Sequence, residues 1–277
     1  MEPEKGDKSI HVGVSDVKKA FIDVGAQPGD MVFFHGSLSS MGTVDGGPVT
    51  VFDGVLEATS PGGTVGMPSL WFSKMGMLEK DFDVKTSPAY TGALSEALRL
   101  DPRSFRSNHF SHAAGAIGAR AEELTANHGA FGPRPSPWSE KAFAEASPWT
   151  RLYQWNALYC FIGVTMRVCT MKHWIEGGLA LHFLATIPEK HRMEARKKLR
   201  MDCQDGIWPF YNGEAWQAEL ERRGLIRKTK IGSATLTAIR TRPMVEETTA
   251  IMLADPNAWL CEPFLGWIES LKYYMEN

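Results

Sequence analysis

Two side chains three residues apart, His173 and Glu176, have the types and spacing for acid–base chemistry. They fall on a helix predicted over residues 170–185, where this spacing brings both onto one face. A carboxylate beside an imidazole fixes the tautomer of the ring and stabilises its protonated form, as a general base requires. Because surface helices often carry such a pair, the spacing alone leaves a purely structural role open.

A second polar segment, residues 35–40 (His-Gly-Ser-Leu-Ser-Ser), directly follows a short apolar run. Small and hydroxylated residues after a strand let a ligand approach the backbone, whose free N–H groups can bind carbonyl or anionic oxygens. The segment lacks the Gly-Lys-Ser/Thr ending of a P-loop, and the chain has no Gly-x-Gly-x-x-Gly. An ordinary strand-to-helix turn is the alternative interpretation.

Residues 106–112 (Arg-Ser-Asn-His-Phe-Ser-His) combine a cation, two hydroxyls and two imidazoles. His109 and His112 could bind zinc together with Cys160 or Cys169. No second closely spaced pair completes such a site, and the chain has no Cys-x-x-Cys. A polar ligand-binding loop is the simpler interpretation, and we expect no metal.

The overall charge excludes some classes of partner. The formal net charge is -2, with 22% charged and 43% hydrophobic residues, which is ordinary for a globular protein. We therefore expect neither nucleic acid nor a membrane as a partner. Residues 189–200 are locally basic, which is typical of a solvated helix face; a phosphate-binding patch is the alternative.

The expected cellular location rests on the lack of a recognisable signal peptide or membrane-spanning stretch in the sequence. Residues 1–8 are charged and without the apolar core of a signal peptide, and no stretch approaches the roughly 20 apolar residues that span a bilayer. The four cysteines are widely spaced, as expected for reduced thiols. These observations predict a cytoplasmic protein.

The elements that position these residues alternate along the chain. Helices are predicted over residues 15–25 and 49–60, and short buried strands over 31–34 and 64–67, which indicates an α/β sheet with crossover connections. We find no repeat or linker and expect one domain over residues 1–277. The further predictions are helices over 91–100, 170–185, 214–223 and 244–254, strands over 159–164 and 231–239, and an irregular loop over 131–148.

The motifs and their order resemble the aminoglycoside 3-N-acetyltransferases, also called antibiotic N-acetyltransferases. Residues 35–42 (HGSLSSMG) resemble the family's H-S-S-L-S-x-x-G, and residues 61–68 (PGGTVGMP) its G-P-x-G-T-L-x-M-P. Residues 106–109 (RSNH) resemble R-S-x-H-P, with Phe110 replacing the proline, and residues 170–176 (TMKHWIE) resemble T-x-L-H-x-x-E. Residues 92–96, 147–152, 162–164 and 230–234 follow in family order, so the resemblance covers about residues 15–250.

The resemblance implies a fold, a reaction and a set of roles. The fold is an α/β layered structure with a central mixed, partly antiparallel sheet flanked by helices. The reaction is transfer of an acyl group from acetyl-CoA, or another acyl-CoA, to a small-molecule amine such as an aminoglycoside antibiotic. His173 acts as general base for direct attack, and Glu176 orients its ring. The spacing suggests that Thr170 bonds the thioester oxygen. The residues implied to lie near the coenzyme A donor are His35, Ser37, Leu38, Ser39, Arg106, Ser107 and His112.

The acceptor is less well defined by the sequence. A polycationic aminoglycoside needs carboxylates around its pocket, and the candidates are Asp83, Asp202, Asp205 and Glu214. The segment 188–214 matches the family poorly and is basic and aromatic. A biosynthetic amine acceptor, or an acyl group larger than acetyl, is therefore the alternative.

Two other classes of function compete with acyl transfer. A hydrolase could use Ser37 with His173, but Ser37 lacks the Gly-x-Ser-x-Gly nucleophile elbow. A non-catalytic binding or scaffold protein would have no reason to keep Thr170, His173 and Glu176 together. Nine tryptophans would suit an aromatic interface between two copies, which leaves a homodimer open.

Overall fold

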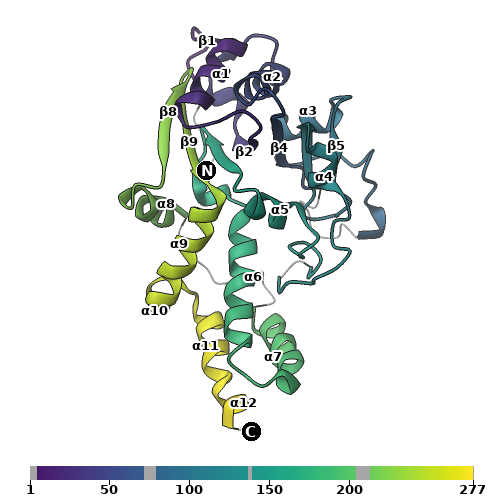
Figure 1. The fold of residues 1–277 in the computed structure, drawn as a ribbon, viewed down its shortest axis with the longest axis vertical. Helices are drawn as coiled ribbons and strands as arrows, with labels where there is room; N and C mark the ends of the chain where they lie inside the picture. Colours follow the sequence, from purple (N-terminus) through teal and green to yellow (C-terminus); the bar gives the residue numbers. More distant parts are fainter. Residues whose placement is uncertain (1–4, 72–78, 137–138, 204–212, 277) are drawn as a thin grey trace.

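A seven-stranded mixed sheet forms the centre of the protein in the computed structural model, which describes residues 5–71, 79–136, 139–203 and 213–276 (Figure 1). The strand order is β5-β6-β4-β2-β7-β9-β8. The middle strands β4, β2 and β7 are parallel, and the outer pairs are antiparallel. The predicted mixed sheet is thereby confirmed. Its strands are β2 (Met31–Gly36), β4 (Thr64–Pro68), β5 (Phe105–Arg106), β6 (Ala114–Gly118), β7 (Leu158–Ile162), β8 (Arg227–Ile231) and β9 (Ala234–Arg240).

Alternating side chains of the central strands belong to two separate hydrophobic clusters, one on each face of the sheet. On β2, Met31 and Phe33 join one cluster, and Val32 and Phe34 join the other, as the period-two geometry of a strand requires. Both faces are covered by helices, and this explains why the central strands read as continuous apolar runs.

Helices α1 (Val14–Asp23), α2 (Pro48–Ala58) and α3 (Ala93–Leu100) pack on the Val32 face. The opposite face is covered by α5 (Pro148–Gln154), α6 (Met171–Leu184) and α9 (Thr241–Ala254). Helix α6 runs away from the sheet, and α7 (Glu189–Asp202), α11 (Glu262–Ser270) and α12 (Lys272–Glu276) lie along its far end (Figure 1). The remaining elements are β1 (His11–Val12), β3 (Thr43–Val44), α4 (Ala121–Thr125), α8 (Gly213–Arg222), α10 (Pro256–Trp259) and the short turns η1 (Leu38–Ser40), η2 (Glu79–Asp81) and η3 (Met166–Val168).

The strand predicted over residues 231–239 is present but begins later, as β9 from Ala234 to Arg240. Strand β8, which ends at Ile231 before the chain turns back into β9, was not predicted. Gly232, with φ of 56°, adopts the left-handed conformation that this turn needs. Strand β6 was also not predicted, since Ala114-Gly115-Ala116 offers small side chains and no bulky apolar run. Residues 131–136 and 139–147 contain no helix or strand, as expected.

The parallel pairing of β2 and β7 positions the candidate site. His35 pairs with Phe161 and Gly36 with Ile162, so the two strands end at the same edge of the sheet. The segment 37–40 follows β2, and η3 and α6 follow β7. Ligands in such sheets bind outside the carboxyl ends of the parallel strands. Segments far apart in the chain therefore meet at this edge.

Candidate active site

The His173–Glu176 pair lies in the first two turns of α6, just beyond the sheet edge. His173 Nδ1 is 2.8 Å from Glu176 Oε2, a hydrogen bond between residues i and i+3. The two side chains are 14% and 4% exposed, so water reaches neither of them freely. The contact that the spacing predicted is present, and it is buried rather than on the helix surface.

Burial decides the charge state of this pair. It lowers the pKa of His173 to about 3, with a smaller contribution from the neighbouring Lys172 cation. Burial also raises the pKa of Glu176 well above its ordinary value, although Lys172 opposes this shift. The imidazole is therefore uncharged at neutral pH. An ionised Glu176 carboxylate would stabilise the imidazolium form of this ring and so raise its basicity.

A cleft of about 990 Å³ opens at the same sheet edge. The segment 35–39, at the end of β2 and just beyond it, forms one side, and the first turn of α3 forms another. Thr170, one turn before His173, also lines it. Five of the residues predicted to contact donor or thioester therefore share one cavity: His35, Ser37, Leu38, Ser39 and Thr170. Most other lining side chains are apolar, namely Val44, Met67, Pro68, Leu70, Tyr90, Ala93, Val164 and Val168.

Gly36 allows these walls to come together. A Cβ atom at this position would lie 3.3 Å from Leu94 Cδ1 of α3 and 3.2 Å from Ile162 Cβ of β7. Both distances are tighter than ordinary van der Waals contact. The glycine thus lets the start of α3 pack over the end of β2.

Tyr159 is a site residue that sequence reasoning missed. Its hydroxyl is 2.8 Å from His35 Nε2, and its oxygen accepts the backbone N–H groups of Thr170 and Met171 at the start of α6. Burial lowers the pKa of His35 to about 3, so this ring is neutral and accepts the tyrosine proton. Tyr159 therefore links the segment after β2 to the helix that carries His173. In the sequence it looks like one more member of an apolar strand.

A second cavity, of about 520 Å³, shares Val164 and Val168 with the large cleft. Three cations line it: Lys5, Arg167 and Lys230. Glu214, a predicted acceptor carboxylate, also lines this cavity and not the large cleft. Asp7 lines this cavity too, so the apolar cleft adjoins a polar cavity with three cations and two carboxylates.

Ser107, His109, Ser111 and His112 are buried, and they do not line the large cleft. The Ser107 hydroxyl accepts the Ala114 N–H and lies 2.9 Å from His128 Nδ1. The centre of the His112 ring lies 5.8 Å from that of His173, with the planes at 80°. The structure thus places His112 in contact with His173, whereas Ser107 bonds to Ala114 and His128 within the loop. Donor contacts by either residue stay a prediction.

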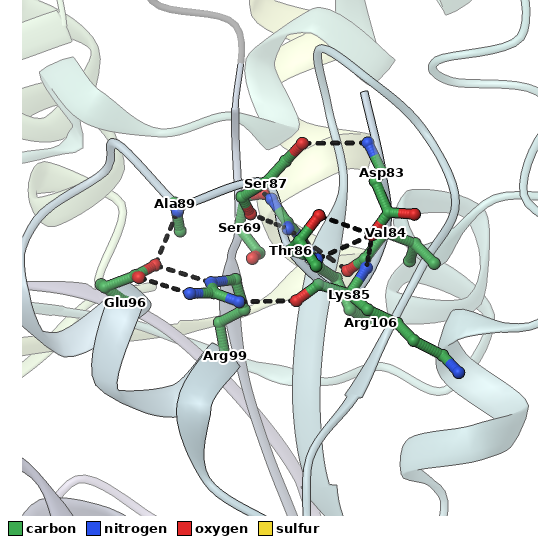
Figure 2. A network of polar contacts seen from close by, with 10 residues as sticks. All are labelled: Ser69, Asp83, Val84, Lys85, Thr86, Ser87, Ala89, Glu96, Arg99 and Arg106. Carbon is green, nitrogen blue, oxygen red and sulfur yellow. Dashed lines mark hydrogen bonds and ion pairs between the residues drawn. The ribbon is translucent and has the colours of Figure 1, made fainter. Parts of the chain in front are cut away.

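Arg106 holds a loop in place through backbone carbonyls (Figure 2). Its Nη2 donates to the Ser69 carbonyl at 2.7 Å, and its Nη1 donates to that of Ser87. The guanidinium also stacks over Phe82, 5.1 Å from the ring centre. Burial, and secondarily Arg99, lowers the pKa of Arg106 to about 10. These contacts indicate a structural role, and the predicted donor contact is untested.

The predicted acceptor carboxylates lie in three different places. Asp83 is exposed and caps its own turn by accepting the N–H groups of Lys85 and Thr86 (Figure 2). Asp202 ends α7 and pairs with Lys198 at 3.0 Å. Burial first, and then the neighbouring Cys261, Asp202 and Glu176, raises the pKa of the adjoining Cys203 to about 12. Asp205 lies outside the described residues.

The metal alternative gains no support from the geometry. Within the described ranges, no three His, Cys, Asp or Glu side chains are arranged to hold a metal ion. Cys160 and Cys169 are free and buried, and burial raises the pKa of the Cys169 thiol to about 12. In the same part of the chain, no helix has both the length and the apolar character needed to cross a membrane.

These features define an α/β acyltransferase-like protein with a buried imidazole–carboxylate pair beside a large cleft. Comparison with known families gives the particular family. The model of the aminoglycoside 3-N-acetyltransferases matches residues 33–253, and the chain belongs to this family. The predicted resemblance is confirmed.

Curated relatives agree with this assignment. Aminoglycoside N(3)-acetyltransferase VII of Streptomyces paromomycinus is 28% identical over 67% of this chain and 65% of its own length, so the match spans just under two thirds of that protein. Aminoglycoside N(3)-acetyltransferase IV of a Salmonella species is 26% identical over 87% of this chain and 88% of its own.

Solved structures share the fold. Aminoglycoside acetyltransferase AAC(3)-IVa superposes with a TM-score of 0.67 at 22% identity, covering 92% of this chain and 94% of that one. AAC-IIIb, solved as a binary complex with CoASH, gives 0.66 at 20% identity, covering 87% and 96%. A complex of an AAC(3)-IVa variant with a gentamicin gives 0.66 at 21%, covering 99% of both chains. These likenesses establish the fold class.

Proposed function

We propose that this protein transfers the acetyl group of acetyl-CoA to an amino group of an aminoglycoside-like amine. Membership of the family supports the reaction class. The observation that carries the proposal is the 2.8 Å contact between His173 and Glu176, buried one turn from a residue that lines the large cleft.

His173 is the proposed general base. An alkylamine is mostly protonated at neutral pH and becomes a nucleophile only after a base removes a proton. A neutral imidazole bonded to Glu176 through Nδ1 presents Nε2 as the acceptor for that proton. The Glu176 carboxylate then stabilises the imidazolium. The amine attacks the thioester carbon directly, and the carbon–sulfur bond breaks. The attacking nitrogen loses its second proton to the departing thiolate of coenzyme A, and the proton taken up by His173 is released to solvent.

The large cleft and the adjoining polar cavity match the two ends of the donor. The apolar lining of the 990 Å³ cleft suits the pantetheine arm and the acetyl group. The hydroxyls of Ser37 and Ser39 could form hydrogen bonds with the amides of the pantetheine arm. The phosphates of coenzyme A need cations, and Lys5, Arg167 and Lys230 supply three in the adjoining cavity. We assign the Thr170 hydroxyl to the thioester oxygen, where negative charge develops.

The acceptor assignment rests on the family and on the end of α7. Asp202, which pairs with Lys198 at the end of α7, is the carboxylate that we assign to the acceptor. Asp83 binds its own backbone instead. A hydrolytic role for Ser37 is not supported, since its hydroxyl faces Ser39 at 3.2 Å and His35 is bonded to Tyr159.

A thiol-release assay tests the proposal. Acetyl-CoA is incubated with the protein and a panel of amines that includes gentamicin, and free coenzyme A is measured. His173→Ala should lose at least about 100-fold in kcat, the lower range for a general base, while retaining its affinity for coenzyme A. His182→Ala, an exposed position on the same helix, is the matched control. Undiminished turnover in folded His173→Ala protein would contradict the assignment.

A further inference from the structure

The Tyr159 hydroxyl is buried where the end of β2, strand β7 and the start of α6 meet. Tyr159 is completely buried on β7. Its oxygen is 2.8 Å from His35 Nε2 and accepts the backbone N–H groups of Thr170 and Met171. Burial, followed by the nearby Cys169 thiol, raises the pKa of Tyr159 well above its ordinary value. The hydroxyl therefore keeps its proton at neutral pH.

The donors around this oxygen fix the direction of its own proton. A phenolic oxygen has two lone pairs, and the N–H groups of Thr170 and Met171 occupy both. A protonated Nε2 of His35 would be a third donor with no lone pair to bind. The Tyr159 O–H therefore donates to His35 Nε2. The Cys169 sulfur is a further acceptor beside this hydroxyl, but sulfur accepts weakly, and the imidazole nitrogen is the stronger acceptor.

That direction sets the tautomer of His35. With Nε2 as the acceptor, the ring proton is on Nδ1. Burial lowers the pKa of His35 to about 3, which keeps the ring neutral. Phe161 stacks on the ring, with the centres 5.7 Å apart and the planes at 7°, and holds it in place. His35 is therefore a fixed, neutral ring whose one N–H is on the nitrogen that does not contact Tyr159.

This second nitrogen is accessible from the large cleft. His35 is 9% exposed, and it lines that cleft at the end of β2. Within the part of the chain that the structure describes, His35 Nδ1 has no hydrogen-bond partner, and it is not one of the fully buried polar atoms left without one. Its N–H can thus donate to a ligand in the cleft. Ser37 and Ser39 follow on the same wall.

We propose that Tyr159 is a positioning residue for donor binding: its hydroxyl holds His35 in the tautomer whose Nδ1–H donates to an amide carbonyl of the pantetheine arm. The inference rests on the proposed use of acetyl-CoA. We assign the thioester oxygen to Thr170, which leaves the amides for the wall at the end of β2. A carbonyl oxygen only accepts, so an unprotonated Nδ1 would repel it. The contact is the same in the ground state and the transition state, and its loss should raise KM rather than lower kcat.

Removing one hydroxyl tests this role. Tyr159→Phe should raise the Kd of coenzyme A, measured by isothermal titration calorimetry, about tenfold, the effect of one buried hydrogen bond. KM should rise equally for acetyl-CoA and acetyl-pantetheine, with kcat within about threefold of the parent. Tyr153→Phe is the matched control, because that hydroxyl bonds Glu246 at 3.0 Å on the surface and its loss should leave Kd unchanged. A fall in kcat with unchanged KM and Kd would overturn the role in donor binding.

Substitutions of His35 show whether Tyr159 acts through this ring. The amide nitrogen of asparagine can occupy the place of Nδ1 and has no tautomer to set, whereas that of glutamine reaches the place of Nε2. His35→Asn should bind coenzyme A within about threefold of the parent, and His35→Gln about tenfold more weakly. Adding Tyr159→Phe to His35→Asn should then change Kd by about twofold at most. A tenfold loss in that background would overturn the positioning role.

Nitrogen-15 NMR of the histidine-labelled parent protein reports the tautomer without turnover. The His35 signals, assigned by their loss in His35→Asn, should show a protonated Nδ1 and an unprotonated Nε2, and coenzyme A should shift the Nδ1 signal. Tyr159→Phe should move the ring toward the opposite tautomer. A protonated Nε2 in the parent protein would refute the inference. If the parent shows the expected tautomer and binds coenzyme A but releases no thiol with any amine, the proposed function fails instead.

Discussion

Replacing Glu176 by glutamine separates the two contributions that this carboxylate makes to His173. The amide oxygen of Glu176→Gln can accept the Nδ1–H of His173 in the same position, so the orientation and tautomer of the ring are kept. The negative charge is lost. The variant therefore isolates the electrostatic stabilisation of the imidazolium from the placement of the ring.

The size of the effect follows from the geometry. With Nδ1 and Oε2 2.8 Å apart, the centres of the imidazolium and carboxylate charges are about 4 Å apart. At an effective dielectric constant of about 20, two unit charges at this distance attract by about 4 kcal/mol. Each ~1.36 kcal/mol changes a rate about tenfold, so the full charge is worth about three orders of magnitude. We expect kcat to fall between about 100-fold and about 1,000-fold.

The same substitution should not destabilise the protein. Because burial raises the pKa of Glu176, its contribution to stability is complete below the unfolded-state pKa, near 4.5, and is lost as pH rises through the folded-state pKa. Glutamine has no charge to bury, so Glu176→Gln should gain stability relative to the parent between about pH 5 and about pH 8. Urea unfolding at these two values measures the difference, and Glu189→Gln, at an exposed site, is the control.

Two results would refute this reasoning. Unchanged kcat in the thiol-release assay would show that the carboxylate charge is not used by the base. A drop in kcat accompanied by a clear fall in the free energy of unfolding at the higher pH would show that Glu176 mainly maintains the fold.

Three further predictions concern stability and the donor. His35, His109 and His112 are buried with lowered pKa values, to about 3 and about 2 for the first two, so their stabilisation is complete above about pH 6.5 and is lost as pH falls below it. The free energy of unfolding, measured with urea, should fall between about pH 6.5 and about pH 5 by up to about 1.4 kcal/mol per pH unit for each histidine. A flat profile would contradict their burial as neutral rings. Arg106→Ala should lower the free energy of unfolding by about 2–4 kcal/mol, because two carbonyls lose their donor, with KM for acetyl-CoA within about threefold of the parent. A large rise in that KM without destabilisation would instead favour a donor contact. Lys230→Gln should raise KM for acetyl-CoA several-fold but leave that for acetyl-pantetheine unchanged, whereas an equal effect on both would exclude phosphate binding by Lys230.

Local sequence patterns determined the elements that carry the site. Apolar runs at residues 31–34, 64–67 and 159–164 identified the three parallel strands, because a strand covered on both faces must be apolar on both. The spacing of His173 and Glu176 predicted their contact, since side chains three apart meet on any helix. The motif order also identified the family.

Elements with a weak sequence pattern, and contacts between residues far apart in the chain, were revealed only by the tertiary structure. The hairpin at Gly232 and strand β6 were missed because a glycine turn within a polar run, and a strand of alanine and glycine, leave no periodic signal. The bond from His35 to Tyr159 joins residues 124 positions apart and depends on the register in which β2 and β7 pair. Burial likewise assigns the charge of the histidines at the site, His35, His112 and His173. Sequence therefore determined which groups could act, and the packing of distant segments determined their neighbours, their protonation and hence their roles.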